Sequence, residues 1–250
     1  MKKIVYFAMI AMVGFSACKK ADPKTNNDSI LTKANIEGQV RLFDEFGQPV
    51  SDERMLVIME GNGFQYTAET DRDGTFLLQN VPYFHNYTIS YMKTDFGTYK
   101  AYNFNHEYTG YAGKIEETPN LSQKSTAYCM ALLSNVENDT VNFQVSVAGG
   151  SENGLRKFRI LFHTIPAISN EVYSIYTHKL TTTGNTQTIR LSKETLTEYG
   201  LESGLLYYAQ VYGDSYYSNA YEDDYNLKHV LPNLGFKEDV AVPTTTFVMP

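Results

Sequence analysis

Residues that could do chemistry are few and scattered in this chain of 250 residues. None of the five histidines begins the H-E-x-x-H or H-x-x-E spacing that sets two zinc ligands on one element. The chain also has no G-x-S-x-G turn, no G-x-x-x-x-G-K-[ST] phosphate loop and no G-x-G-x-x-G after a strand. We therefore expect no enzyme, no cofactor and no metal site, although the fold could still bring together two carboxylates that are distant in sequence. The histidines are His85, His106, His163, His178 and His229.

A stretch rich in tyrosines and acids, residues 213–242, separates two expected strands near the end of the chain. Loops of this length are uncommon and are often functional or disordered. Sugar rings present apolar faces rimmed by hydroxyls, so phenol rings beside hydrogen-bond acceptors could bind glycans. The alternative is that these tyrosines cover the end of a domain and the acids are solvated. The candidate ligand-binding residues are Tyr216, Tyr217, Tyr221, Asp223, Asp224 and Tyr225.

A short acidic motif, Asp71-x-Asp73-Gly74, has two interpretations. Alternating carboxylates can begin a calcium loop, but such a loop needs a bidentate glutamate further on, and none follows at the required distance. Asp-Gly also marks a chain reversal, because glycine tolerates positive φ and aspartate bonds its own backbone. We expect a plain hairpin turn.

The N-terminus has the pattern of an export signal. Two lysines precede an apolar stretch, and small residues lead to a cysteine. Phe15-Ser16-Ala17-Cys18 resembles the lipobox of bacterial lipoproteins, with Phe15 where leucine is usual. The resemblance implies that residues 1–17 are a signal peptide, that Cys18 carries a diacylglyceryl group, and that the protein is anchored to the outer membrane, on the cell surface or the periplasmic face. The alternative is an ordinary secretory peptide with an incidental cysteine.

Residues 18–33 are polar and contain a proline, which predicts a flexible tether. The apolar stretch before Cys18 is too short to span a bilayer as a helix, and no later segment has such a run. If Cys18 carries lipid, Cys129 has no partner for an intramolecular disulfide. Because Cys129 lies in an apolar run, we expect a buried, inert thiol rather than a reactive one.

Composition favours a folded protein made of β-strands. The chain has 20 tyrosines, 14 phenylalanines and no tryptophan, and tyrosine suits strands that are half buried. At 20%, the charged fraction is too low for a disordered, solvating chain. The net charge of −7 leaves no basic face for nucleic acid.

Short apolar runs broken by turn residues predict a first β-sandwich over residues 34–112. Tyr87, Ile89 and Tyr91 alternate with polar residues, as expected of a half-buried strand. The ordered pieces Ile36-x-Gly38-x-Val40, Asp44-x-x-Gly47-x-Pro49-Val50, Thr70-Asp71-x-x-Gly74-x-Phe76, Val81-Pro82 and Tyr87-x-Ile89 resemble the carboxypeptidase regulatory-like domain. This resemblance implies a transthyretin-like, immunoglobulin-like sandwich that is not itself catalytic.

Residues 122–250 predict a second sandwich with about seven strands. One short helical turn is expected over residues 192–198. The motif Leu201-x-x-Gly204-x-x-Tyr207 resembles the tyrosine corner of fibronectin type III domains, in which the phenol bonds back to nearby backbone. The expected fold class is therefore all-β, with two tandem Ig-like β-sandwich domains.

The first functional hypothesis is a non-enzymatic, lipid-anchored binding or adhesion protein of the envelope. Its first sandwich would be a spacer, and residues 213–242 would be the contact surface, with a glycan as one candidate ligand. The alternative is a structural accessory subunit that docks to a larger outer-membrane assembly through a sheet edge or an apolar patch. Its partners would be the membrane, through the lipid, and an envelope protein.

Overall fold

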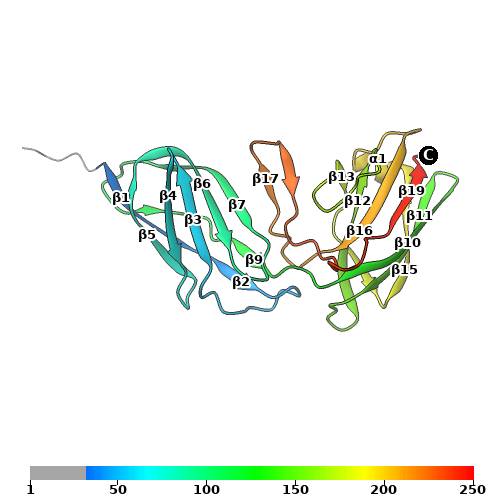
Figure 1. Ribbon diagram of the computed structural model, residues 1–250, viewed down its shortest axis with the longest axis horizontal. Coiled ribbons are helices and arrows are strands. Elements are labelled where there is room, and N and C mark those ends of the chain that lie inside the picture. The colour runs from blue at the N-terminus through cyan, green and yellow to red at the C-terminus, as the bar shows by residue number, and fades with distance from the viewer. Residues whose placement is uncertain (1–31) are drawn as a thin grey trace, which may run out of the picture. The chain divides into compact units, whose positions relative to one another are not determined.

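The computed structural model describes residues 32–250. The predicted signal peptide, Cys18 and nearly all of the predicted tether lie outside the described residues. Residues 32–250 form one compact unit, and among them the only helix is α1 (Lys193–Glu198) (Figure 1). No helix in this range is long and apolar enough to cross a membrane. The predicted all-β class and its β-sandwich architecture are confirmed.

Nine strands between residues 33 and 122 build the first sandwich (Figure 1). They are β1 (Lys33–Gln39), β2 (Arg41–Phe43), β3 (Leu56–Gly61), β4 (Phe64–Glu69), β5 (Thr75–Pro82), β6 (Phe84–Met92), β7 (Tyr99–His106), β8 (Gly113–Lys114) and β9 (Asn120–Ser122). One sheet has the order β5-β1-β8, a second has the order β4-β3-β6-β7, and β2 pairs with β9. Strand β8 pairs in parallel with β1, and β9 pairs in parallel with β2. The sheets of the first sandwich therefore include residues beyond 112, where we expected this domain to end.

The core of the first sandwich follows the predicted alternation. Tyr87, Ile89 and Tyr91 on β6 are each 1% exposed. The turn before β5 is held by Asp71, whose carboxylate accepts hydrogen bonds from the amides of Asp73 and Thr75 at 2.9 Å each. The acidic motif therefore closes its own turn, as expected of Asp-Gly. The turn is not the expected hairpin, because β4 and β5 on either side of it lie in different sheets and the chain crosses from one to the other.

The remaining strands build the second sandwich and a small hairpin. They are β10 (Tyr128–Glu137), β11 (Thr140–Ala148), β12 (Leu155–His163), β13 (Ile175–Tyr176), β14 (Leu180–Thr183), β15 (Thr186–Ser192), β16 (Leu206–Gly213), β17 (Tyr221–Asp223), β18 (Lys228–Val230) and β19 (Thr244–Val248). The main sheet has the order β13-β12-β16-β10-β11-β15, with β14 beside β12 and β19 beside β16. Strands β10 and β16 pair only at Tyr128 and Tyr212, so this contact is a corner between two halves.

The two halves close on a shared aromatic core. The ring of Phe143 on β11 lies 6.1 Å from that of Phe162 on β12 and 5.4 Å from that of Phe247 on β19, between centroids. At the start of β16 the amide of Glu202 donates to the hydroxyl of Tyr207 at 3.0 Å. The phenol therefore bonds back to nearby backbone, as the tyrosine-corner resemblance implied.

The segment 213–242 is not the structureless loop that its length and composition suggested. It contains the antiparallel hairpin β17–β18, in which Tyr221 pairs with Val230. Four of its polar residues are buried, since Asp214 is 3% exposed, Ser215 0%, Asn219 5% and Asn233 0%. Buried polar groups need hydrogen-bond partners, so this segment is fixed by specific contacts on both sides of the hairpin.

Candidate functional site

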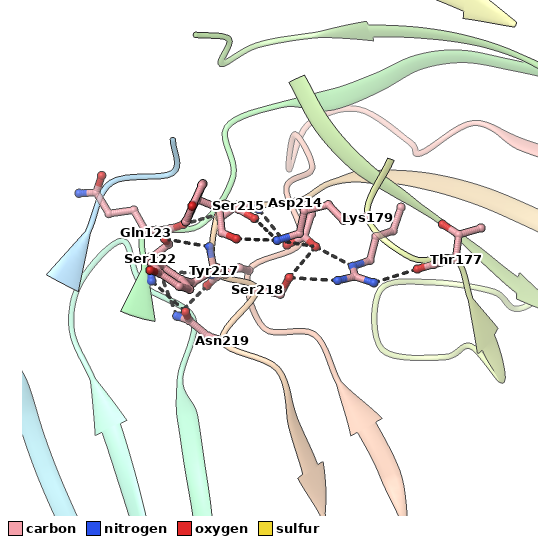
Figure 2. Close-up of polar contacts among 12 residues, drawn as sticks. Ser122, Gln123, Thr177, Lys179, Asp214, Ser215, Tyr217, Ser218 and Asn219 are labelled. Carbon is pink, nitrogen blue, oxygen red and sulfur yellow. Dashed lines mark hydrogen bonds and ion pairs between the residues drawn. The ribbon is translucent and has the colours of Figure 1, made fainter. Parts of the chain in front are cut away.

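The first residues of the 213–242 segment enter a buried polar network where the two sandwiches meet (Figure 2). The fully buried carboxylate of Asp214 accepts from Nε of Arg159 at 2.6 Å and from Oγ of Ser218 at 2.7 Å. The ammonium of Lys179 lies 3.9 Å from the same carboxylate and donates to the main-chain oxygen of Ser215 at 2.6 Å. The charge of Asp214 is thus balanced within the protein, which gives this acid a structural role.

Two buried asparagines tie the same segment to the first sandwich. Oδ1 of Asn219 accepts from the amide of Ser122 at 2.8 Å, and its Nδ2 donates to Oδ1 of Asn233 at 3.1 Å. That oxygen of Asn233 also accepts from the amide of Gly97 at 2.9 Å. A Cβ on Gly97 would lie 2.4 Å from it, so only glycine permits this close approach. These bonds satisfy backbone groups at the end of β9 and before β7.

Tyr216 and Tyr217 pack at this junction, although Tyr216 stays 47% exposed. The ring of Tyr217 packs on Phe43 with centroids 4.8 Å apart. The ring of Tyr216 lies against Gly47, and Nζ of Lys157 lies 4.5 Å from its centroid. Both rings therefore cover contacts within the described unit, as the alternative interpretation of the loop tyrosines expected.

The other four candidates lie together with a strand of the first sandwich. The ring of Tyr102 on β7 lies 6.2 Å from that of Tyr221 and 6.2 Å from that of Tyr225, between centroids. Nδ2 of Asn103, also on β7, donates to Oδ2 of Asp224 at 2.5 Å. Tyr225 is 85% exposed, so its ring is free to meet a ligand. We name this surface the tyrosine patch; its residues are Tyr102, Asn103, Tyr221, Asp223, Asp224 and Tyr225.

The contribution of β7 was missed from the sequence. Tyr102 and Asn103 lie more than a hundred residues before the hairpin, and no local pattern links them to it. The only available signal was the run Tyr99-Lys-Ala-Tyr-Asn-Phe, which is rich in aromatic and amide side chains and was not assigned to a strand. The first sandwich is therefore part of the candidate surface, rather than only the spacer we expected.

The electrostatics of the patch favour a neutral, hydroxyl-bearing ligand. Burial, and then the nearby charge of Asp223, raise the pKa of Tyr102 to about 12, so this phenol is neutral at pH 7. A hydrogen bond from the Asn226 side chain, with one from the amide of Tyr225, lowers the pKa of Asp223 and keeps it ionised. Phenol rings beside Asp223 and Asp224 offer flat faces and acceptors. The charge of Lys100 also lowers the pKa of Asp223, but two carboxylates against this one lysine disfavour anions.

The described residues place neither a metal-binding cluster nor a reactive thiol at the patch. Within residues 32–250 no group of three His, Cys, Asp or Glu side chains could hold a metal ion. Cys129 is 4% exposed, and burial raises the pKa of its thiol to about 11. The thiol is therefore protonated at neutral pH, in agreement with the inert cysteine that was expected.

Comparison with known proteins gives similarity only at the level of solved structures. No family model matches the chain, and no curated protein matches it. A candidate carbohydrate-binding protein from Bacteroides uniformis is 12% identical over 86% of this chain and 99% of that one, with a TM-score of 0.31. A DUF3823 family protein from Bacteroides ovatus is 14% identical over 74% of this chain and 91% of that one, with a TM-score of 0.26.

A third structure that this chain resembles contains the FN1–FN3 domains of chicken CNTN1. It is 9% identical over 81% of this chain and 58% of that one, with a TM-score of 0.27. At these identities and TM-scores the names of the three proteins say nothing about the ligand of this chain. What the residues themselves establish is an all-β protein with Ig-like sandwiches, in which the half-buried Tyr221 and the exposed Tyr225 gather beside Tyr102 on β7.

Proposed function

We propose that this chain is a non-enzymatic envelope protein that binds neutral glycans on the tyrosine patch. The observation that carries the proposal is the meeting of Tyr102, Tyr221 and Tyr225 from two distant parts of the chain, with Asn103 and Asp224 bonded to each other beside them. A sugar ring stacks its apolar face on a phenol and gives its hydroxyls to carboxylate and amide groups. The patch supplies both kinds of group.

The proposal includes a lipid anchor on Cys18 that holds the protein at the outer membrane. Its support is the order of basic, apolar and small residues before that cysteine. Several acyl chains on one cysteine would give stable anchoring. A polar tether over residues 18–33 would then let the patch reach a ligand away from the bilayer.

A screen of the purified protein against immobilised glycans tests this function. The protein should bind neutral glycans and ignore uronic-acid and sulfated ones, because the patch is acidic. Tyr225→Ala should weaken the binding at least tenfold, since exposed aromatic anchors carry much of the energy at such surfaces. Tyr111→Ala is the matched control, because Tyr111 is 82% exposed and lies outside the patch. If both variants bind glycans equally well, the tyrosine patch is not the binding site.

A second candidate function, an accessory subunit of an envelope assembly, is favoured by exposed apolar side chains on the second sandwich. Met130 and Leu133 on β10 are 57% and 63% exposed, and Leu206 on β16 and its pairing partner Val248 on β19 are 46% and 53% exposed. Exposed apolar groups can mark a protein contact. Replacing Leu133 by Gln would abolish docking under this candidate and leave glycan binding unchanged.

A further inference from the structure

A cavity of about 390 Å³ lies beside the tyrosine patch, within the size range of small-molecule sites. One wall is formed by β6 and β7, at the edge of the four-stranded sheet. The other is formed by residues 114–119, which connect β8 to β9. The wall residues that matter below are Tyr91, Tyr99, Ala101, Tyr102 and Ile115.

Tyr91 gives the cavity a polar group in a largely apolar wall. The residue is 1% exposed and lines the cavity, and no hydrogen bond of its hydroxyl is found within residues 32–250. This hydroxyl is not among the fully buried unpaired atoms of these residues, so it reaches the cavity and can bond to a ligand or water there. Phe76 and Tyr99 hold the ring, with centroids 6.1 and 5.8 Å from that of Tyr91. Burial raises the pKa of Tyr91, so the hydroxyl can both donate and accept at neutral pH.

The cavity and the patch form one continuous surface. Tyr102 and Asn103 line the cavity, and the same two residues contact Tyr225 and Asp224 in the patch. Tyr99 also lines the cavity, and its ring centroid lies 6.3 Å from that of Tyr221. A ligand lying on the patch therefore meets the cavity at Tyr102.

We propose that the cavity receives the terminal sugar of a neutral glycan whose following units lie on the tyrosine patch. This inference rests on the proposed glycan-binding function and adds that the protein recognises chain ends. Because Ile89 and Tyr91 in its wall belong to the buried core of the first sandwich, the cavity ends against that core, and we expect a chain to enter it by one end. The apolar side chains of Ala101 and Ile115 can pack on the face of a pyranose ring. The phenol hydroxyls in the wall can form hydrogen bonds with the hydroxyls at the edge of the ring. The wall carries Glu116 and Glu117 against one lysine, Lys114, which lies 3.4 Å from Glu116, and the remaining negative charge disfavours an anionic sugar.

Two variants in the cavity and one in the patch separate the two surfaces. Tyr91→Phe removes one hydroxyl that bonds to no described residue, so it should leave the melting temperature of the protein unchanged or raise it. It should weaken binding of a chain end roughly three- to tenfold, the usual effect of one hydrogen bond. Ala101→Phe fills the cavity and should weaken end binding more than tenfold. Tyr225→Ala, in the patch, should weaken binding of any glycan chain.

The experiment measures affinity by calorimetry for short linear gluco-, manno-, xylo- and galacto-oligosaccharides, each free and with a bulky group on either end. We expect at least one free oligosaccharide to bind. A bulky group on one of its ends should weaken this binding roughly tenfold. In Tyr91→Phe, which should melt like the parent protein, the affinities for the free and the blocked oligosaccharide should become nearly equal. If a free oligosaccharide binds but neither blocking nor Tyr91→Phe changes its affinity by more than about twofold, the end-binding role is overturned and the proposed function stands. If no oligosaccharide and no neutral polysaccharide binds, the proposed function itself fails.

Discussion

Replacing Asp214 by asparagine should destabilise the protein strongly, because it breaks a buried ion pair. The Asp214 side chain is 0% exposed and that of Arg159 is 12% exposed. Removing one partner of such a pair costs about 3–5 kcal/mol, since the remaining charge stays buried. Arg159 keeps two acceptors, the Thr177 carbonyl at 2.8 Å and the Ser218 hydroxyl at 3.1 Å. We therefore expect a loss near the lower limit, about 3 kcal/mol.

Urea unfolding followed by circular dichroism measures this loss. With an m-value of about 3 kcal/mol/M, the midpoint should fall by about 1 M. Sodium chloride at about 1 M should not erase the difference, because buried pairs are screened weakly. Asp239→Asn is the matched control: Asp239 is exposed, and its substitution should change the free energy of unfolding by less than about 0.5 kcal/mol. A midpoint for Asp214→Asn within about 0.2 M of the parent protein would refute the reasoning.

Three further predictions concern stability, each measured by urea or thermal unfolding. Tyr207→Phe should lower the free energy of unfolding by about 1–2 kcal/mol, because the amide of Glu202 loses its acceptor. An unchanged unfolding midpoint would show that the hydrogen bond from Glu202 to Tyr207 does not stabilise the fold. Gly47→Ala should lower the free energy of unfolding by about 1 kcal/mol or more, because φ of Gly47 is +97° and the new Cβ would lie 2.5 Å from the Tyr216 ring. An unchanged free energy of unfolding would contradict the packing of Tyr216 on Gly47. Burial lowers the pKa of His106 in the folded state, so the unfolded state takes up the proton first. Stability should therefore be complete above pH 6.5 and decrease as the pH falls towards the folded-state pKa, and His106→Phe should lose this dependence.

The sheets were predictable where one strand carries its own signal. Tyr87, Ile89 and Tyr91 alternate with more polar residues because one face of β6 is buried. Asp71 and Gly74 mark the turn before β5, because the aspartate bonds to backbone within the next four residues. The corner at Tyr207 was recognisable for the same reason, since its partner Glu202 is five residues away. Strand β4 was missed although Phe64, Tyr66 and Ala68 alternate with polar residues, whereas β7 shows no clear apolar alternation.

The candidate site was predictable only in part, because it depends on contacts between distant segments. The tyrosines and acids of the hairpin were named from composition, but Tyr102 and Asn103 reach them only through the fold. In the same way Asn219 and Asn233 look like loop residues in the sequence. Their burial becomes intelligible once Ser122 and Gly97 are seen to supply their partners.

Affinity electrophoresis tests the central claim, glycan binding by the tyrosine patch, most directly. The purified protein would migrate through native gels that contain a neutral glucan, mannan, xylan or galactan, or the acidic polygalacturonate. We expect at least one neutral polysaccharide to slow the migration of the protein and polygalacturonate to leave it unchanged. The double variant Tyr221→Ala with Tyr225→Ala should lose this retardation, and Tyr111→Ala should keep it. Migration unaffected by every neutral polysaccharide, or retardation that survives in the double variant, would contradict the account.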